Sequence, residues 1–84
     1  MEQTNQSQPK YHPSEKLEKQ IKETFTYHPP KGDQTERYVL IRGAANTLAL
    51  TWAANCPESR ELSAALTLLQ QANMMANAAI ACNE

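Results

Sequence analysis

The sequence predicts an all-α protein in which a short N-terminal helix precedes a long antiparallel helical hairpin. Apolar residues recur at helical spacing in three stretches, and each stretch follows a capping or turn sequence. Prolines separate the three stretches, at residues 29–30 and at residue 57. The third stretch carries no charged residue between positions 62 and 83, which indicates a helix that is buried on most of its sides.

Residues 1–13 are polar, contain two prolines and show no periodicity, so we expect a flexible tail. Residues 14–84 are expected to form a single helical domain for oligomerisation and ligand binding. The net charge of −1 argues against DNA, RNA or an anionic membrane as a partner. The uncharged C-terminal stretch is long enough to span a membrane, but five Gln and Asn residues interrupt it, and we expect no membrane span.

The first predicted helix occupies residues 14–25, and Ser14 is its expected N-cap. Its apolar residues follow i, i+4, i+8 spacing and form one narrow stripe, made of Leu17, Ile21 and Phe25. We expect Phe25 to lie in the core. A stripe this narrow requires a neighbouring element to hold the helix in place. Pro29 and Pro30 end the helix near residue 26, because a residue before proline avoids the helical region.

The second predicted helix runs from about Gln34 to Asn55, after a turn at residues 31–33. Asp33, with Glu36 three residues later, resembles a capping box. Arg37 is expected to pair with one of these two carboxylates or to remain free for a ligand. Apolar residues then recur at spacings of 3 and 4, which is a heptad seam. Its members are Tyr38, Ile41, Ala45, Leu48 and Trp52.

The third helix is expected to begin at Pro57, since proline suits the first position of a helix. Its heptad seam includes one polar residue, Asn73, and consists of Leu62, Leu66, Leu69, Asn73, Ala76 and Ile80. The short connection makes the second and third helices an antiparallel hairpin. The other faces of the third helix are also apolar, and a single partner helix cannot cover all of them. We therefore infer an obligate oligomer.

The residue types and spacings do not predict an enzyme. No paired carboxylates share a face, no Ser or Cys nucleophile has a nearby histidine, and no glycine loop suits a phosphate. His12 and His28 with the two cysteines do not have zinc-site spacing, so we expect no metal and no cofactor. Cys56 and Cys82 are too far apart to pair if one helix joins them. Two lone thiols and no apolar leader indicate a reducing cytoplasm.

Aromatic and basic residues gather instead at the joint between the first two helices, FTYHPPKGDQTERY, residues 25–38. Tyr27 and His28 follow the first helix, Lys31 lies in the turn, and Arg42 follows on the second helix. A stacking ring with cationic groups, beside a helix N-terminus, suits a base and a phosphate. Three alternatives stay open: Tyr27 packs against the prolines, His28 satisfies the turn, and Arg42 pairs with a carboxylate of another subunit.

Three blocks of the sequence resemble the phage anti-CBASS sponge family, the second anti-CBASS type described, where CBASS is cyclic-oligonucleotide-based antiphage signalling. The blocks are FTYHPPKGDQTERYVLIR, CPESRELSAALTLLQ and MANAAIACNE, and the resemblance extends over about residues 14–84. It implies a compact all-α homohexamer in the cytoplasm of the infected host. Such a protein binds cyclic dinucleotides, for example cyclic GMP-AMP, without cleaving them, so that downstream effectors stay inactive.

The resemblance also assigns roles to particular residues. The family's binding tyrosine matches Tyr27, and its phosphate-binding basic residue, which can be lysine, matches Arg42. A two-fold subunit interface would present both residues twice, to two bases and two phosphates. Some members use a basic residue near the position of Cys82 for cyclic trinucleotides, so we expect weak or absent trinucleotide binding here. The alternative function is a small helical oligomer that binds another protein through its lysine-bearing first helix, with no nucleotide ligand.

Overall fold

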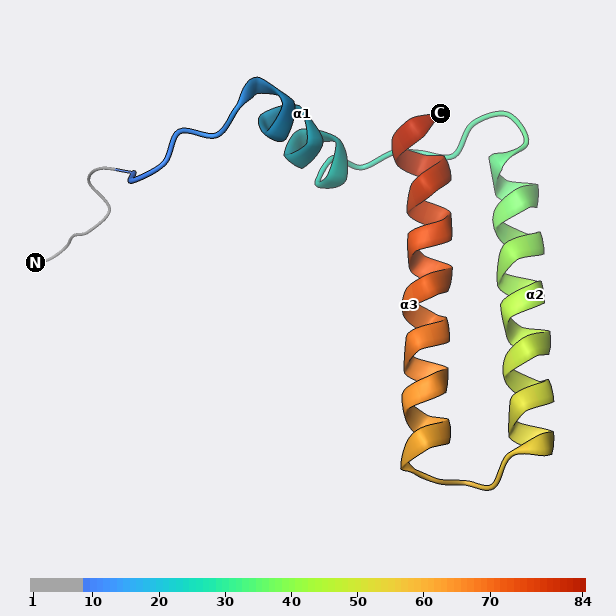
Figure 1. Cartoon of the computed structure of the whole chain (residues 1–84). Coiled ribbons are helices and arrows are strands. Elements are labelled where there is room, and N and C mark those ends of the chain that lie inside the picture. Colours follow the sequence, from blue (N-terminus) through green and yellow to red (C-terminus); the bar gives the residue numbers. More distant parts are fainter. Residues whose placement is uncertain (1–8) are drawn as a thin grey trace, which may run out of the picture.

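The computed structural model describes residues 9–84, which contain three helices: α1 (Glu15–Thr24), α2 (Gln34–Asn55) and α3 (Arg60–Asn83). No strand occurs within these described residues. α2 and α3 lie side by side and antiparallel, whereas α1 lies beside the C-terminal end of α3 (Figure 1). The predicted all-α hairpin fold is therefore confirmed. Of the predicted tail, residues 1–8 lie outside the described part, and residues 9–13 form no helix or strand.

α1 begins at the predicted cap. Ser14 has an extended backbone, and its Oγ accepts a hydrogen bond from the Leu17 N–H at 3.1 Å, which satisfies a donor that the first helical turn leaves free. The prediction that Phe25 lies in the core is wrong for the single chain. The reason is that, among the helices of the described chain, α1 contacts only α3, at one end, and Phe25 remains 83% exposed. The apolar stripe of α1 is therefore left for another surface to cover.

α2 has the predicted bounds, but the expected capping box does not form. Asp33 occupies the N-cap position with φ −90° and ψ 12°, and its side chain makes no capping hydrogen bond. An N-cap normally has extended backbone angles, which aim its side chain at the free N–H groups. The preceding residue, Gly32, has φ 58°, and this turn brings the chain into the helix without an extended cap. The Asp33 carboxylate is used elsewhere, by Arg37.

α3 begins three residues later than expected. Pro57 precedes the helix, and the N-cap is Ser59, whose Oγ accepts a hydrogen bond from the Leu62 N–H at 3.1 Å. The Ser59 hydroxyl also donates to the Pro57 carbonyl at 3.0 Å. A serine cap satisfies a free N–H of the first turn, whereas a proline at the first helical position only removes one. The cap therefore determined the start of the helix.

The seam between α2 and α3 is largely the predicted one, and Leu62, 8% exposed, is its most buried apolar residue in the described chain. Two predicted members are exposed, Leu48 and Ala76, and their next neighbours Ala49 and Asn77 are partly buried instead. The next predicted members of the two seams, Trp52 and Ile80, are partly buried as expected, so the shift by one residue is local in each helix.

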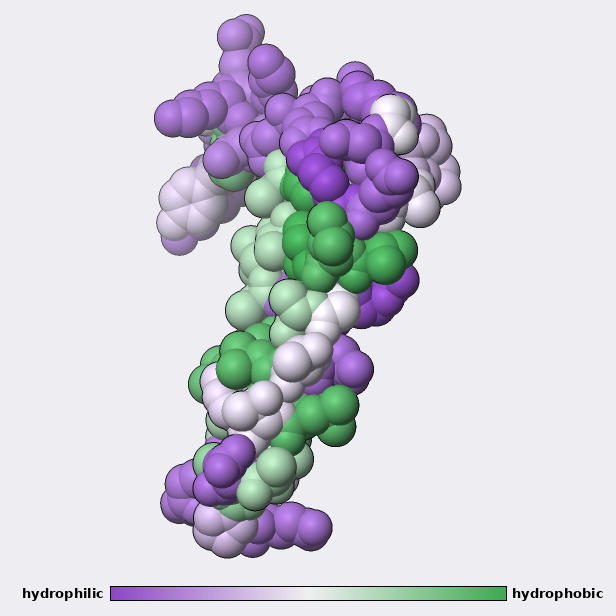
Figure 2. Space-filling model, turned by 90° about the vertical axis from the view of Figure 1, so that its right-hand side faces the viewer, coloured by the Kyte–Doolittle hydropathy of each residue, from purple (hydrophilic) through white to green (hydrophobic). Residues whose placement is uncertain are grey.

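Much apolar surface stays uncovered in one chain. Among the described residues, Leu62 and Gln34 alone are buried. The large exposed apolar residues of the hairpin are Val39, Leu40, Leu48, Leu50, Leu68, Met74 and Met75. Figure 2 shows hydrophobic residues along the length of the hairpin, between more hydrophilic ends. Monomeric proteins rarely expose contiguous apolar patches larger than a few hundred Å², so this surface supports the inference that copies of the chain associate.

Candidate functional site

Tyr27 lies on the segment between α1 and α2, and its ring is accessible. The residue is 80% exposed. Both of its neighbours bond back to the last turns of α1. Thr26 Oγ1 donates to the carbonyl oxygen of Lys22, and His28 Nε2 lies 2.7 Å from the carbonyl oxygen of Glu23. These contacts hold the backbone on either side of Tyr27 and leave its ring free to stack on a planar group.

His28 is partly buried, and its contact with Glu23 agrees with the alternative in which it satisfies the turn. A carbonyl oxygen can only accept, so Nε2 must carry a proton and donate in this contact. Nδ1 is then the ring nitrogen left for a ligand. His28 thus orients the segment that carries Tyr27, whether or not it also contacts the ligand.

Lys31 lies in the turn predicted before α2. The Gln34 N–H donates to the Lys31 carbonyl at 3.1 Å, and Gly32 supplies the positive φ that favours glycine. Lys31 and His28 line one groove of about 1080 Å³, which lies between α1 and the C-terminal end of α3. Two of the predicted ligand residues therefore share a surface within one chain.

Arg42 is exposed on α2, two turns or about 12 Å along the helix from Gln34. It lines a second hollow of about 330 Å³, together with Tyr38, Asn77, Ala78 and Ala81, and Ala81 also lines the groove. Within residues 9–84, no ion pair involves Arg42. Its guanidinium is therefore available to an anion. Tyr27 lines neither the groove nor this hollow, so one chain does not bring the four predicted residues into a single cavity.

Two asparagines of α3 were not predicted as part of any site. The Oδ1 atoms of Asn73 and Asn77 are buried and have no hydrogen-bond partner within the described residues. A buried acceptor without a partner costs about 1–3 kcal/mol. The heptad spacing predicts Asn73 on the seam but does not include Asn77, which lines the hollow beside Arg42. The sequence signal for Asn77 was its position one helical turn after Asn73.

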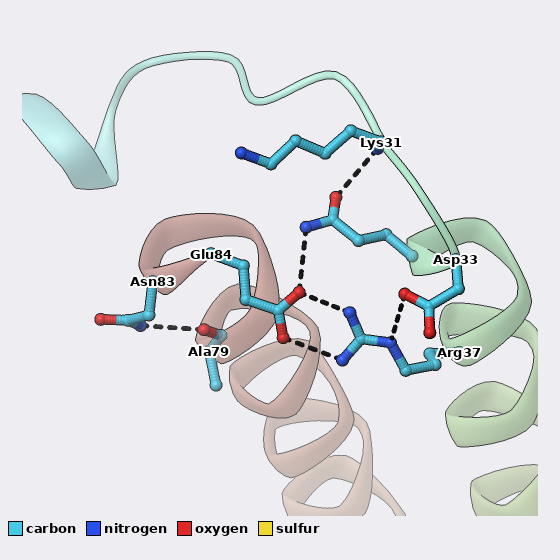
Figure 3. Close-up of polar contacts among 7 residues, drawn as sticks. Lys31, Asp33, Arg37, Ala79, Asn83 and Glu84 are labelled. Carbon is cyan, nitrogen blue, oxygen red and sulfur yellow. Dashed lines mark hydrogen bonds and ion pairs between the residues drawn. The ribbon is translucent and has the colours of Figure 1, made fainter.

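Arg37 makes more contacts than the sequence predicted. The expected pairing with Asp33 is confirmed, because Nε donates to Asp33 Oδ1 at 3.1 Å. The guanidinium also donates to both carboxylate oxygens of Glu84, through Nη1 to Oε2 at 2.8 Å and through Nη2 to Oε1 (Figure 3). This two-pronged contact joins the start of α2 to the end of α3. The pairing of Arg37 with Glu84 is not predicted by any local pattern in the sequence.

The contact between Arg37 and Glu84 changes the titration of both groups. Hydrogen bonds from Arg37 and then from Gln34 lower the pKa of Glu84 from its ordinary value of 4.5 to about 2. The hydrogen bond to Glu84 is also the main reason that the pKa of Arg37 is raised. Both side chains are partly exposed, so dissolved salt screens their attraction. The Arg37 guanidinium and the Glu84 carboxylate are therefore both charged throughout the neutral pH range.

The lowered pKa of Glu84 predicts an acid dependence at this end of the hairpin. The Arg37–Glu84 contact stabilises the folded state fully above pH 4.5. This stabilisation is lost as the pH falls from about 4.5 to about 2, because the Glu84 carboxylate is then protonated. NMR titration of the Glu84 and Arg37 side chains measures this transition. The variant Glu84→Gln should lack it, whereas Glu61→Gln, on the first turn of α3, should keep it. An Arg37 signal that is unchanged down to pH 2 would contradict the prediction.

The fold and these contacts define a class of protein: an all-helical hairpin with an exposed tyrosine and cationic side chains around one end. No helix in the described part of the chain is long and apolar enough to cross a membrane. The sequence model of the Acb2/Tad1 hairpin domain matches residues 17–81, a range that includes all four predicted ligand residues. The chain therefore belongs to the Acb2/Tad1 family of phage anti-CBASS sponges, which bind cyclic nucleotides. No curated protein and no solved structure matches the chain.

Proposed function

We propose that the chain sequesters cyclic dinucleotides, such as cyclic GMP-AMP, in the cytoplasm of the infected host and does not cleave them. Bound messenger cannot reach the CBASS effectors, which then stay inactive. The observation that carries this proposal is the match of residues 17–81 to the Acb2/Tad1 hairpin domain. The exposed ring of Tyr27 and the exposed guanidinium of Arg42 add support, because a stacking surface and a cation are what a nucleotide requires.

Association of the chains would complete the proposed site. No single hollow of one chain holds all the predicted ligand residues: His28 and Lys31 line the groove, Arg42 lines the smaller hollow, and Tyr27 lines neither. Across a two-fold interface, one Tyr27 and one Arg42 from each copy would meet the two bases and two phosphates of a cyclic dinucleotide. We propose the homohexamer implied by the family resemblance. The exposed apolar surface of the hairpin and the uncovered stripe of α1 support association between copies.

Binding and cleavage can be separated in one experiment. Calorimetric titration with cyclic GMP-AMP measures affinity, and the mass of the complex in solution gives the number of subunits. The ligand is then released by heating and identified by chromatography. Recovery of intact cyclic GMP-AMP supports sequestration, whereas recovery of linear dinucleotide would indicate an enzyme. Absence of binding to any cyclic dinucleotide in a panel would reject the proposed function.

Cyclic trinucleotides are expected to bind weakly or not at all. Cys82 stands near a position where some members of the family carry a basic residue, and it cannot supply that charge. In this structure Cys82 is partly buried, and its Sγ lies 3.8 Å from the carbonyl oxygen of Glu23. Titration with a cyclic trinucleotide tests the prediction, and Cys82→Arg is the matched variant that should gain affinity. Tight binding by the unmodified chain would contradict it.

One observation favours a second candidate function. The apolar residues of α1 remain exposed on a helix that also carries three lysines, and such an amphipathic helix can dock on another protein. In that case the chain is an oligomeric interaction module without a nucleotide ligand. The two candidates differ in the same titration: an interaction module gives no heat with cyclic GMP-AMP at any protein concentration.

A further inference from the structure

The least exposed residue in the described chain is polar. Gln34, the first residue of α2, is 4% exposed, and both ends of its side-chain amide are bonded. Its Oε1 accepts from the Lys31 N–H at 3.1 Å, and its Nε2 donates to Glu84 Oε1 at 3.2 Å. A buried polar group that is satisfied on both sides specifies one arrangement of its partners. Gln34 therefore ties the turn before α2 to the residue that follows the end of α3.

Glu84 receives donors from two residues of α2 at once. The fork of Arg37 binds both carboxylate oxygens, and the amide of Gln34 binds one of them (Figure 3). Arg37 is itself held by Asp33, the residue that precedes α2. Bidentate charge-assisted contacts fix geometry more strongly than single neutral hydrogen bonds. Removing the Glu84 carboxylate would therefore release both Arg37 and Gln34.

The same network reaches the segment that carries the proposed ligand residues. The backbone of Lys31 is bonded twice to Gln34, once through its N–H and once through its carbonyl. The side chain of Lys31 extends from the turn over the end of α3 in Figure 3, and its charge acts favourably on the Glu84 carboxylate. The position of Lys31 thus depends on Glu84 through Gln34.

We propose that Glu84 is a positioning residue for ligand binding: it holds Gln34 and Arg37 together and thereby fixes the turn at Lys31 in the geometry that the ligand meets. The inference rests on the proposed cyclic-dinucleotide function, and it assigns Glu84 no contact with the ligand. A negative charge near a phosphate site would otherwise weaken binding, because like charges repel. Pairing with Arg37 neutralises that charge.

The test is a calorimetric titration of Glu84→Gln with cyclic GMP-AMP, alongside the mass of the assembly in solution. We expect binding about 5- to 10-fold weaker, since a partly exposed ion pair is lost from each of two copies of the turn, and an unchanged assembly mass. Glu61→Gln removes the same charge at the opposite end of α3, where the carboxylate is exposed, and it should bind normally. Glu84→Gln with wild-type affinity would overturn the proposal.

A double-mutant cycle separates positioning from a direct electrostatic effect. If Glu84 acts through the turn, then Glu84→Gln should cost much less in a Lys31→Ala background, whereas independent effects add. Hydrogen exchange of the Lys31 amide should also be faster in Glu84→Gln, because its bond to Gln34 loosens. Full additivity would contradict the proposal. Should Glu84→Gln not assemble, Gln34→Met removes the bridge alone, leaves the Arg37–Glu84 pair in place, and should also weaken binding. If the wild-type chain binds no cyclic dinucleotide, the proposed function fails, and the exchange measurement still tests the contact.

Discussion

Replacing Arg42 by alanine is expected to weaken cyclic GMP-AMP binding by about 100-fold or more and to leave the assembly intact. A hydrogen bond to a charged group contributes about 1.5–3 kcal/mol, and a two-fold site would lose it twice. Arg42 is exposed and forms no ion pair within the described residues, so its removal breaks no ionic contact of the hairpin there. Calorimetric titration with a parallel mass measurement gives both quantities.

Two further variants make the Arg42 result specific. Arg60→Ala removes the same charge from the other end of the hairpin, where the side chain is almost fully exposed, and it should bind normally. Arg42→Lys keeps the charge but cannot grip two phosphate oxygens with a planar fork, so it should show an intermediate loss. Equal affinities for Arg42→Ala and Arg60→Ala would show that Arg42 is not part of the site.

Tyr27→Ala is expected to weaken cyclic GMP-AMP binding by about 30-fold or more. Stacking of a base on an aromatic ring contributes about 1–3 kcal/mol, and a site with two copies of Tyr27 loses two rings. The ring is 80% exposed, so its removal should leave the helices and their association unchanged. The measurement is the same titration, checked by circular dichroism for helix content.

Tyr27→Phe and Tyr11→Ala are the matched controls. The first retains the stacking ring and should keep most of the affinity, because stacking requires the ring rather than the hydroxyl. The second removes a comparably exposed tyrosine from outside the predicted site and should have no effect. If Tyr27→Phe binds as poorly as Tyr27→Ala, the hydroxyl rather than stacking carries the interaction.

The fold could be predicted from the sequence where short-range signals decide it. The bounds of α2 and the Ser14 cap agree with the predictions, because turn chemistry and helical spacing act within a few residues. The start of α3 was misplaced, since Pro57 and Ser59 both signal a helix start and the sequence does not rank them. The predicted burial of Phe25 was also wrong, because the apolar stripe of α1 needs a covering surface that the hairpin of the same chain does not provide.

In the candidate site, too, local sequence signals predicted some features, whereas contacts between distant residues could not be predicted. Tyr27, His28 and Lys31 lie at the joint where the sequence concentrates them, and they remain predictions as ligand residues. The partnership of Arg37 with Glu84 could not be predicted, since 47 positions separate the two residues. Only the register of the hairpin brings them together. The bridging role of Gln34 depends on that same register.

A chain that buries only two of its described residues would, under the proposed association of copies, depend on its own concentration for stability. Association is governed by mass action, so crowded chains would gain stability that dilute ones lack. A messenger that bridges two copies would add its binding free energy to the union. Under the proposed function, a rise in the cyclic dinucleotide would therefore stabilise the assembly that sequesters it. Sequestration would then become more effective as infection proceeds.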